Sequence, residues 1–129
     1  MAPITLTLPF PPSVNRIWRS IGGRTILSAI GRKYRQAVIQ ATQQQRSPQL
    51  GSARLEVLME VFQPDLRKRD LDNLPKAVLD GLTHSHVYKD DSQIDCLAII
   101  RRSVDRKDPR IVVTIRTTDC SHESPKEAA

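Results

Sequence analysis

The sequence has few cysteines and no long apolar run, and these absences exclude several classes of protein. Its two cysteines, Cys96 and Cys120, are far apart and match no zinc-binding or redox spacing. Cys96 falls in an apolar run, so we expect a small buried side chain. No run approaches the ~20 apolar residues of a membrane span, and the N-terminus lacks a basic region followed by an apolar stretch. The sequence therefore predicts a soluble, cytoplasmic protein.

Histidine is also scarce. His84 and His86 lie close together in the sequence, but no cysteine or third histidine stands at a zinc-ligand spacing from them. We therefore expect no zinc site here.

Positive charge is abundant by contrast. The chain has 20 Lys and Arg against 14 Asp and Glu, a net charge of +6. Residues 119–129 carry three carboxylates and one lysine, so residues 1–118 have a net charge of +8. A field of this sign favours a polyanionic partner, most simply nucleic acid.

The hydrophobic periodicity predicts a single α+β domain, residues 1–118, with a mixed sheet and helices packed against it. Residues 119–129 are expected to form a flexible tail. Ser28 is a candidate N-cap for the first long helix, whose polar face is basic and is either solvated or in contact with DNA. The last two strands are expected to pair as a hairpin across a polar connector. The predicted strands are 4–8, 53–63, 92–104 and 111–116, and the predicted helices are 28–46 and 72–83.

Two aspartates, Asp70 and Asp72, are the strongest candidates for chemistry. In an extended segment leading into a helix, their i, i+2 spacing points both side chains to the same side. Two carboxylates at such a short separation repel each other unless a cation lies between them. Mg²⁺ suits such a pair, because it is held by one or two carboxylates with waters and substrate phosphate in the remaining positions. The alternative for Asp72 is a helix N-cap.

Lys76 follows Asp72 by one helical turn. Pro75 is tolerated only in the first turn of a helix, so it fixes the helix start near Asp72. Lys76 then either forms an i, i+4 ion pair with Asp72 or Asp80, or stabilises the negative charge that develops on a scissile phosphate.

Asp90 and Asp91 could supply a further carboxylate. Their side chains point to opposite sides, so we expect only one to reach the site. A strand that begins near Ser92 would place Asp91 beside the helix start. A bare Asp-Asp pair is otherwise typical of a turn.

The segment 67–69 (Arg-Lys-Arg) lies where a phosphate backbone would pass on its way to Asp70. Phosphate contact is its natural role, and a solvated basic loop is the alternative.

These residues together resemble the signature of the RusA family of Holliday-junction resolvases. The resemblance rests on residues 69–74 (Arg-Asp-Leu-Asp-Asn-Leu), Lys76 and residues 90–94 (Asp-Asp-Ser-Gln-Ile). Residues 8–16 (Leu-Pro-Phe-Pro-Pro-Ser-Val-Asn-Arg) are similar to the opening of that family. The resemblance covers residues 4–118, with Pro75 as a departure from the more usual polar residue.

The resemblance implies a homodimeric, Mg²⁺-dependent endonuclease that cuts two opposed strands of a four-way DNA junction, with Mn²⁺ as a possible substitute. Asp70, Asp72 and Asp91 match the metal-binding catalytic carboxylates, and Lys76 matches the essential lysine. The residues expected to bind DNA are Asn15, Arg16, Arg67, Lys68, Arg69 and Asn73. Two alternatives stay open: a nuclease for forks or flaps, and a basic DNA-binding module without catalysis.

Overall fold

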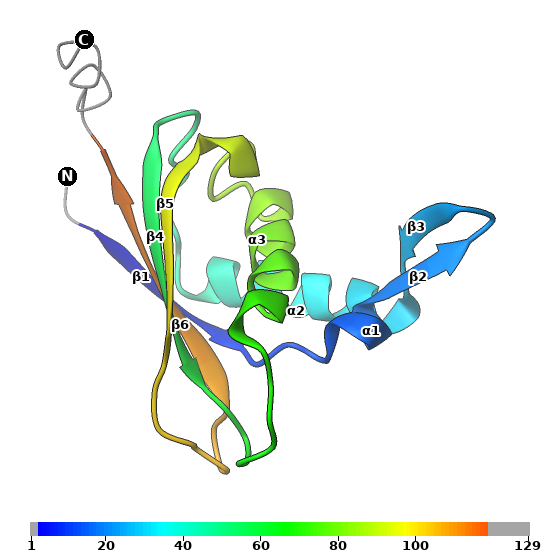
Figure 1. Cartoon of the computed structure of the whole chain (residues 1–129). Coiled ribbons are helices and arrows are strands. Elements are labelled where there is room, and N and C mark those ends of the chain that lie inside the picture. The colour runs from blue at the N-terminus through cyan, green and yellow to red at the C-terminus, as the bar shows by residue number, and fades with distance from the viewer. Residues whose placement is uncertain (1–2, 119–129) are drawn as a thin grey trace, which may run out of the picture.

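A four-stranded sheet forms the centre of the computed structural model, which describes residues 3–118. The strand order is β1–β6–β4–β5, with β4 and β5 parallel and the other neighbours antiparallel (Figure 1). In β4 the alternation is regular, so its odd-numbered residues face the core and its even-numbered residues are half-buried. The strands are β1 (Ile4–Pro9), β4 (Leu55–Phe62), β5 (Ile94–Arg101) and β6 (Arg110–Thr117).

The predicted hairpin between the last two strands is wrong. β6 lies between β1 and β4, whereas β5 lies at the edge beyond β4. The connector 102–109 is long enough to cross the end of β4, so β5 and β6 are neighbours in sequence but not in the sheet. β4 and β5 are joined instead through a helix, as parallel strands require.

Two helices, α2 (Ala29–Gln44) and α3 (Pro75–His84), cover one face of the sheet (Figure 1). Ser28 caps α2 as predicted, because its hydroxyl oxygen accepts a hydrogen bond from the Gly31 amide at 3.0 Å. Val38 of α2 and Val78 of α3 are fully buried against the sheet. The structure therefore confirms the predicted α+β class with a mixed sheet.

A second, smaller sheet follows a short helix, α1 (Val14–Ile17). It is a hairpin of β2 (Trp18–Ile21) and β3 (Arg24–Leu27) that stands out from the domain (Figure 1). The two strands are joined by a turn at Gly22-Gly23, where φ values of +56° and +76° explain why two glycines are needed. The strands on either side of the turn were not predicted.

Cys96 is exposed, so its predicted burial is wrong. It lies in the edge strand β5, most of whose residues remain exposed although they form an apolar run. The predicted tail and Cys120 lie outside the described residues. Between residues 3 and 118, no helix is long and apolar enough to cross a membrane.

Candidate active site

Asp65 shapes the basic segment that leads to the candidate carboxylates. Its Oδ1 accepts hydrogen bonds from the Arg69 guanidinium at 2.7 Å and from the Arg67 amide at 2.9 Å. The Arg69 contact first, and the Arg67 amide second, lower the pKa of Asp65 to about 2. The Arg69 guanidinium also lies 5.3 Å from the centre of the Phe10 ring. Arg69 is therefore part of the loop's internal structure, whereas the side chains of Arg67 and Lys68 extend into solvent.

Gln63 and Arg101 hold the same segment from the sheet. The Gln63 side chain is 4% exposed, and its amide nitrogen donates to the Arg67 carbonyl at 3.3 Å. Arg101 donates to the Gln63 side-chain oxygen at 2.9 Å and to the Arg69 carbonyl. Sequence reasoning missed both residues. Gln63 was detectable, since it continues the inward-facing alternation of β4 by one more step.

Asp70 and Asp72 follow this segment as free carboxylates. Asp70 has an extended backbone, and Asp72 lies within a 3₁₀ turn, η1 (Leu71–Asn73). Helix α3 begins at Pro75 with Leu74 as its N-cap, so the alternative considered for Asp72, a helix N-cap, is wrong. The 3₁₀ turn takes up three of the four residues between Asp70 and Pro75. Among residues 3–118, neither carboxylate has a hydrogen-bond or ion-pair partner, and both are exposed.

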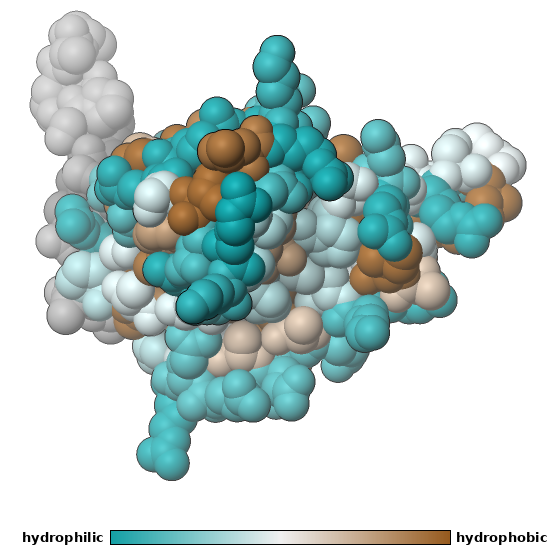
Figure 2. All heavy atoms as spheres, turned by 90° about the horizontal axis from the view of Figure 1, so that it is seen from below, coloured by the Kyte–Doolittle hydropathy of each residue, from teal (hydrophilic) through white to brown (hydrophobic). Residues whose placement is uncertain are grey.

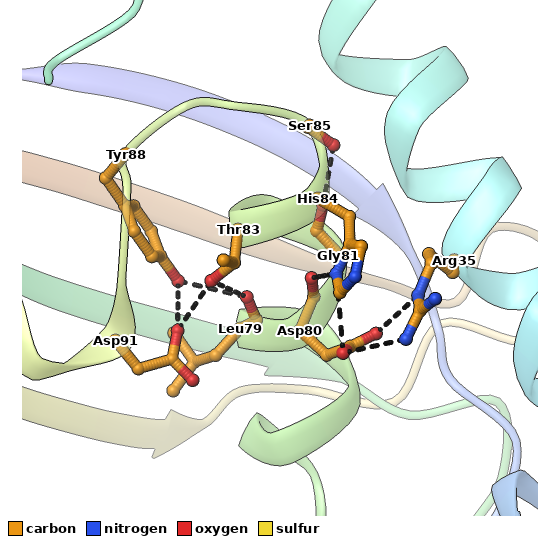
Figure 3. Close-up of polar contacts among 9 residues, drawn as sticks. All are labelled: Arg35, Leu79, Asp80, Gly81, Thr83, His84, Ser85, Tyr88 and Asp91. Carbon is orange, nitrogen blue, oxygen red and sulfur yellow. Dashed lines mark hydrogen bonds and ion pairs between the residues drawn. The ribbon is translucent and has the colours of Figure 1, made fainter. Parts of the chain in front are cut away.

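Lys76 does not form either of the ion pairs considered for it. Its ammonium group lies 4.4 Å from the centre of the Trp18 ring, a cation–π contact with the base of the β2–β3 hairpin. Asp80 is occupied by Arg35 of α2, with nitrogen–oxygen distances of 2.9 and 3.1 Å (Figure 3). Trp18 was not predicted, and no local pattern signals a contact between such distant residues.

Asp91 is held by two hydroxyl groups (Figure 3). Its Oδ1 lies 2.7 Å from the Thr83 hydroxyl and 3.1 Å from the Tyr88 hydroxyl, both of which also lie within reach of the Leu79 carbonyl. Burial raises the pKa of Tyr88, so its hydroxyl remains a proton donor. The other oxygen of Asp91 has no hydrogen-bond partner among the described residues.

Asp91 lies against the last turn of α3, not beside its start as predicted. Thr83 follows Pro75 by eight residues, which is about 12 Å along the helix axis. Asp90 takes the turn role in this pair, because it caps a second 3₁₀ turn, η2 (Asp91–Gln93), by accepting from the Ser92 amide. Asp90 and the buried Gln93 together form a capping box for this turn. The Gln93 side chain also donates to two carbonyl groups of the loop before β4.

Two hollows flank the segment 67–70. The first, of about 680 Å³, contains Asp70 and Asp72 together with Arg101 and Arg102. The second, of about 640 Å³, also contains Asp70 and is bordered by the segment 10–16. All six residues predicted to bind DNA line this second hollow: Asn15, Arg16, Arg67, Lys68, Arg69 and Asn73. Asp70 is thus shared by two cationic hollows.

The carboxylates fit Mg²⁺ only in part. In the described part of the chain, no three His, Cys, Asp or Glu side chains lie close enough to hold a metal together. Asp70 and Asp72 are nevertheless exposed and unpaired, and Mg²⁺ requires only one or two protein carboxylates. Asp91 is oriented through one oxygen and leaves the other available, as is common for metal ligands supported by neighbouring groups.

Comparison with known proteins gives consistent matches. Residues 9–116 match the family model described as Endodeoxyribonuclease RusA. The chain is 40% identical over 94 residues to the crossover junction endodeoxyribonuclease rusA of Enterobacteria phage HK97, which covers 73% of this chain and 78% of the relative. It is 37% identical over 111 residues to the crossover junction endodeoxyribonucleases RusA of Escherichia coli K12 and Shigella sonnei Ss046, covering 86% of this chain and 92% of each relative. The family match includes both hollows, Lys76 and Asp91.

Proposed function

The chain belongs to the RusA family of endodeoxyribonucleases, and we propose that it is a crossover junction endodeoxyribonuclease, a hydrolase that cuts four-way (Holliday) DNA junctions. The family match over residues 9–116 carries this proposal. The site supports it, because two cationic hollows meet at an unpaired carboxylate. Such an arrangement suits the chemistry of a phosphodiester. The activity would serve DNA recombination and repair.

Asp70, Asp72 and Asp91 are the proposed ligands of Mg²⁺, for which Mn²⁺ could substitute. When bound, the ion would supply a water of lowered pKa and would neutralise charge on the phosphate. Hydrolysis would leave a 5′-phosphate and a 3′-hydroxyl.

Cationic side chains do the rest of the proposed work. Arg67 and Lys68 extend into solvent beside Asp70 and would bind the phosphates on either side of the cleaved bond. Lys76 would stabilise the charge that develops on the scissile phosphate, and its ammonium group lies against the Trp18 ring.

The edge strand β5 is the proposed contact between two copies of the chain. In the described residues β5 pairs with β4 alone, so its other edge is unpaired. Leu97 and Ile100 are 41% and 36% exposed there. An exposed apolar edge strand is a template for pairing with another chain. Antiparallel pairing of two β5 strands would give a homodimer with a two-fold axis, matching a substrate that must be cut on two strands.

This pairing would also complete the metal site. Asp91 comes just before the start of β5, and Arg101 at the end of β5 shares the first hollow with Asp70 and Asp72. In an antiparallel pair the start of one strand lies opposite the end of the other. The partner's Asp91 would therefore approach Asp70 and Asp72, although the Asp91 of the same chain lies against the far end of α3.

Replacement of one proposed ligand tests the function. Asp70→Asn should still bind a synthetic four-way junction but should not cleave it in Mg²⁺, because the amide cannot replace a charged ligand. Asp108→Asn is the matched control, since Asp108 is an exposed carboxylate in the β5–β6 connector. Wild-type cleavage by Asp70→Asn would contradict the assignment.

A further inference from the structure

The β2–β3 hairpin presents one face that the catalytic site does not use. The strand register pairs Arg19 with Ile26 and Ile21 with Arg24. Directly opposed residues of an antiparallel pair lie on the same face, and so do residues two apart along a strand. These four side chains therefore form one face of the hairpin, which we call the Arg–Ile face.

The Arg–Ile face is open to solvent. Ile21 is 51% exposed and Ile26 is 39% exposed, and both arginines are exposed as well. Neither the Arg19 nor the Arg24 guanidinium has an ion-pair or hydrogen-bond partner within residues 3–118. Figure 2 shows the hairpin at the right edge of the molecule, where apolar and strongly hydrophilic surfaces lie side by side.

The hairpin is fixed at its base although its tip is free. The Ser28 amide donates to the Ile17 carbonyl at 2.8 Å, and the Arg32 guanidinium donates to the Leu27 carbonyl at 3.0 Å. Gly31 of α2 packs directly under it, since an added Cβ would lie 2.6 Å from the Ile17 carbonyl oxygen. A two-stranded hairpin alone is marginally stable. These contacts therefore hold the Arg–Ile face in a fixed direction.

Charge indicates what this face binds. Residues 1–55 contain eight Lys and Arg and no Asp or Glu, so neither the hairpin nor α2 carries a carboxylate side chain. The base of the hairpin adjoins the catalytic site, because Trp18 contacts Lys76 and the preceding residues Asn15 and Arg16 line the second hollow. A phosphate backbone that leaves the second hollow in this direction would meet the Arg–Ile face next.

We propose that the Arg–Ile face binds the sugar–phosphate backbone of a duplex arm of the junction, next to the strand that is cut. Arg19 and Arg24 contact phosphates, and Ile21 and Ile26 lie against deoxyribose. Contacts of this kind position the substrate and carry no sequence information. The proposal rests on the proposed function, since it takes a DNA junction as the substrate.

The salt dependence of junction binding tests the proposal. Each phosphate contact contributes about 0.9 to the slope of log affinity against log salt concentration, so the double variant Arg19→Ala/Arg24→Ala should lower that slope by about 1.8. Binding is measured on a four-way junction without divalent metal, so that no strand is cut. The matched control is Arg46→Asn/Arg116→Ala, which removes the same charge away from the hairpin. Asn is chosen because Arg46 has a φ of 54°.

An unchanged slope in the hairpin variant, or an equal fall in the control, would overturn the proposal. A second variant, Ile21→Ser/Ile26→Ser, tests whether the Arg–Ile face binds a second copy of the chain instead. Loss of the dimer mass in this variant, together with an unchanged salt slope in Arg19→Ala/Arg24→Ala, would assign the face to that second copy. Failure of the wild-type protein to cut junctions would overturn the proposed function. Normal junction cutting by the wild-type protein, together with an unaltered salt slope in Arg19→Ala/Arg24→Ala, would overturn only the proposal for the Arg–Ile face.

Discussion

Asp70 and Asp72 differ from Asp91 in how their carboxylates are held. The first two have no partner among residues 3–118, whereas Oδ1 of Asp91 accepts from hydroxyl groups of Thr83 and Tyr88 (Figure 3). A carboxylate that is already oriented loses less freedom on binding a cation. Thr83 and Tyr88 are therefore positioning residues for Asp91 in the proposed site.

Removal of both hydroxyls should weaken Mg²⁺ binding. Thr83→Val/Tyr88→Phe is expected to raise the Mg²⁺ concentration for half-maximal cleavage roughly tenfold, as fits the loss of hydrogen bonds to a charged group. The rate at saturating Mg²⁺ should fall much less. Calorimetric titration with Mg²⁺ checks the affinity independently of activity, and Thr83→Ser is the control because it keeps a hydroxyl. An unchanged Mg²⁺ requirement would mean that the hydroxyls serve the fold alone.

Asp65 should titrate far below an ordinary aspartate. Its pKa is lowered from 3.8 to about 2 by Arg69 and the Arg67 amide. Because the folded-state pKa lies below the unfolded one, the contact stabilises the loop above pH of about 4 and is lost as pH falls from about 4 to about 2. Carboxyl NMR should place the midpoint near 2, and Arg69→Gln should raise it. A midpoint near 4 in the wild-type protein would contradict the loop geometry.

Local sequence pattern predicted which acidic and basic residues make up the candidate site, but not the contacts that hold them. Asp70, Asp72 and the basic residues before them lie in one short segment, so their proximity follows from the chain itself. The contacts of Asp91 with Thr83, and of Lys76 with Trp18, depend on where whole elements lie. The placement of Asp91 was wrong for this reason, because it assumed a strand register that no local pattern sets.

At the scale of elements, α2 and α3 cross where Gly81 faces Val38. A Cβ at Gly81 would lie 2.8 Å from both Cβ and Cγ1 of Val38, which is closer than packed side chains approach. The two helices therefore contact through backbone and a small β-branched side chain. This contact sets the distance between α2 and α3, the helix that carries Thr83.

Gly81→Ala should destabilise the protein although alanine favours helices. Overpacking at this crossing is expected to lower the free energy of unfolding by about 1–3 kcal/mol. Urea denaturation measures the change, with Gln40→Ala on the exposed face of α2 as a control that should shift it by a few tenths of a kcal/mol. Val38→Ala should partly compensate in the double variant, because it removes the opposing methyl groups. Stabilisation by about 1 kcal/mol, the usual helix-interior effect, would contradict the close crossing.

The types of the main elements were predictable, whereas their pairing was not. The alternation in β1 and β4 and the spacing of apolar residues in α2 reflect single elements packed on one core. The hairpin prediction for β5 and β6 used sequence proximity alone. β6 lies between β1 and β4, two strands that are distant from it in the sequence. Residue periodicity cannot distinguish such a central position from an edge position.

In the whole molecule, the proposed dimer would bring together proposed metal ligands that lie apart in one chain. Asp91 lies against the end of α3, about 12 Å along the helix axis from Pro75. Asp70 and Asp72 come before Pro75, at the other end of this helix. Antiparallel pairing of two β5 edges would bring the partner's Asp91 toward them. Each of the two sites would then take residues from both chains.

Mixing two inactive variants tests this arrangement. Asp70→Asn and Asp91→Asn should each fail to cut a junction. In a mixed dimer with shared sites, one site carries both substitutions and the other carries none, so an equal mixture should recover roughly a quarter of the wild-type nicking. The products should be single nicks. Sites contained within one chain would each keep a substitution, and the mixture would then stay inactive.

The proposed junction cleavage is tested most directly with a synthetic four-way junction, each strand labelled in turn, with and without Mg²⁺. We expect two nicks at symmetric positions on opposed strands in Mg²⁺ or in Mn²⁺, and much weaker cutting of forks and flaps. Cleavage in the presence of a chelator, or equal cutting of all branched substrates, would contradict the proposed function.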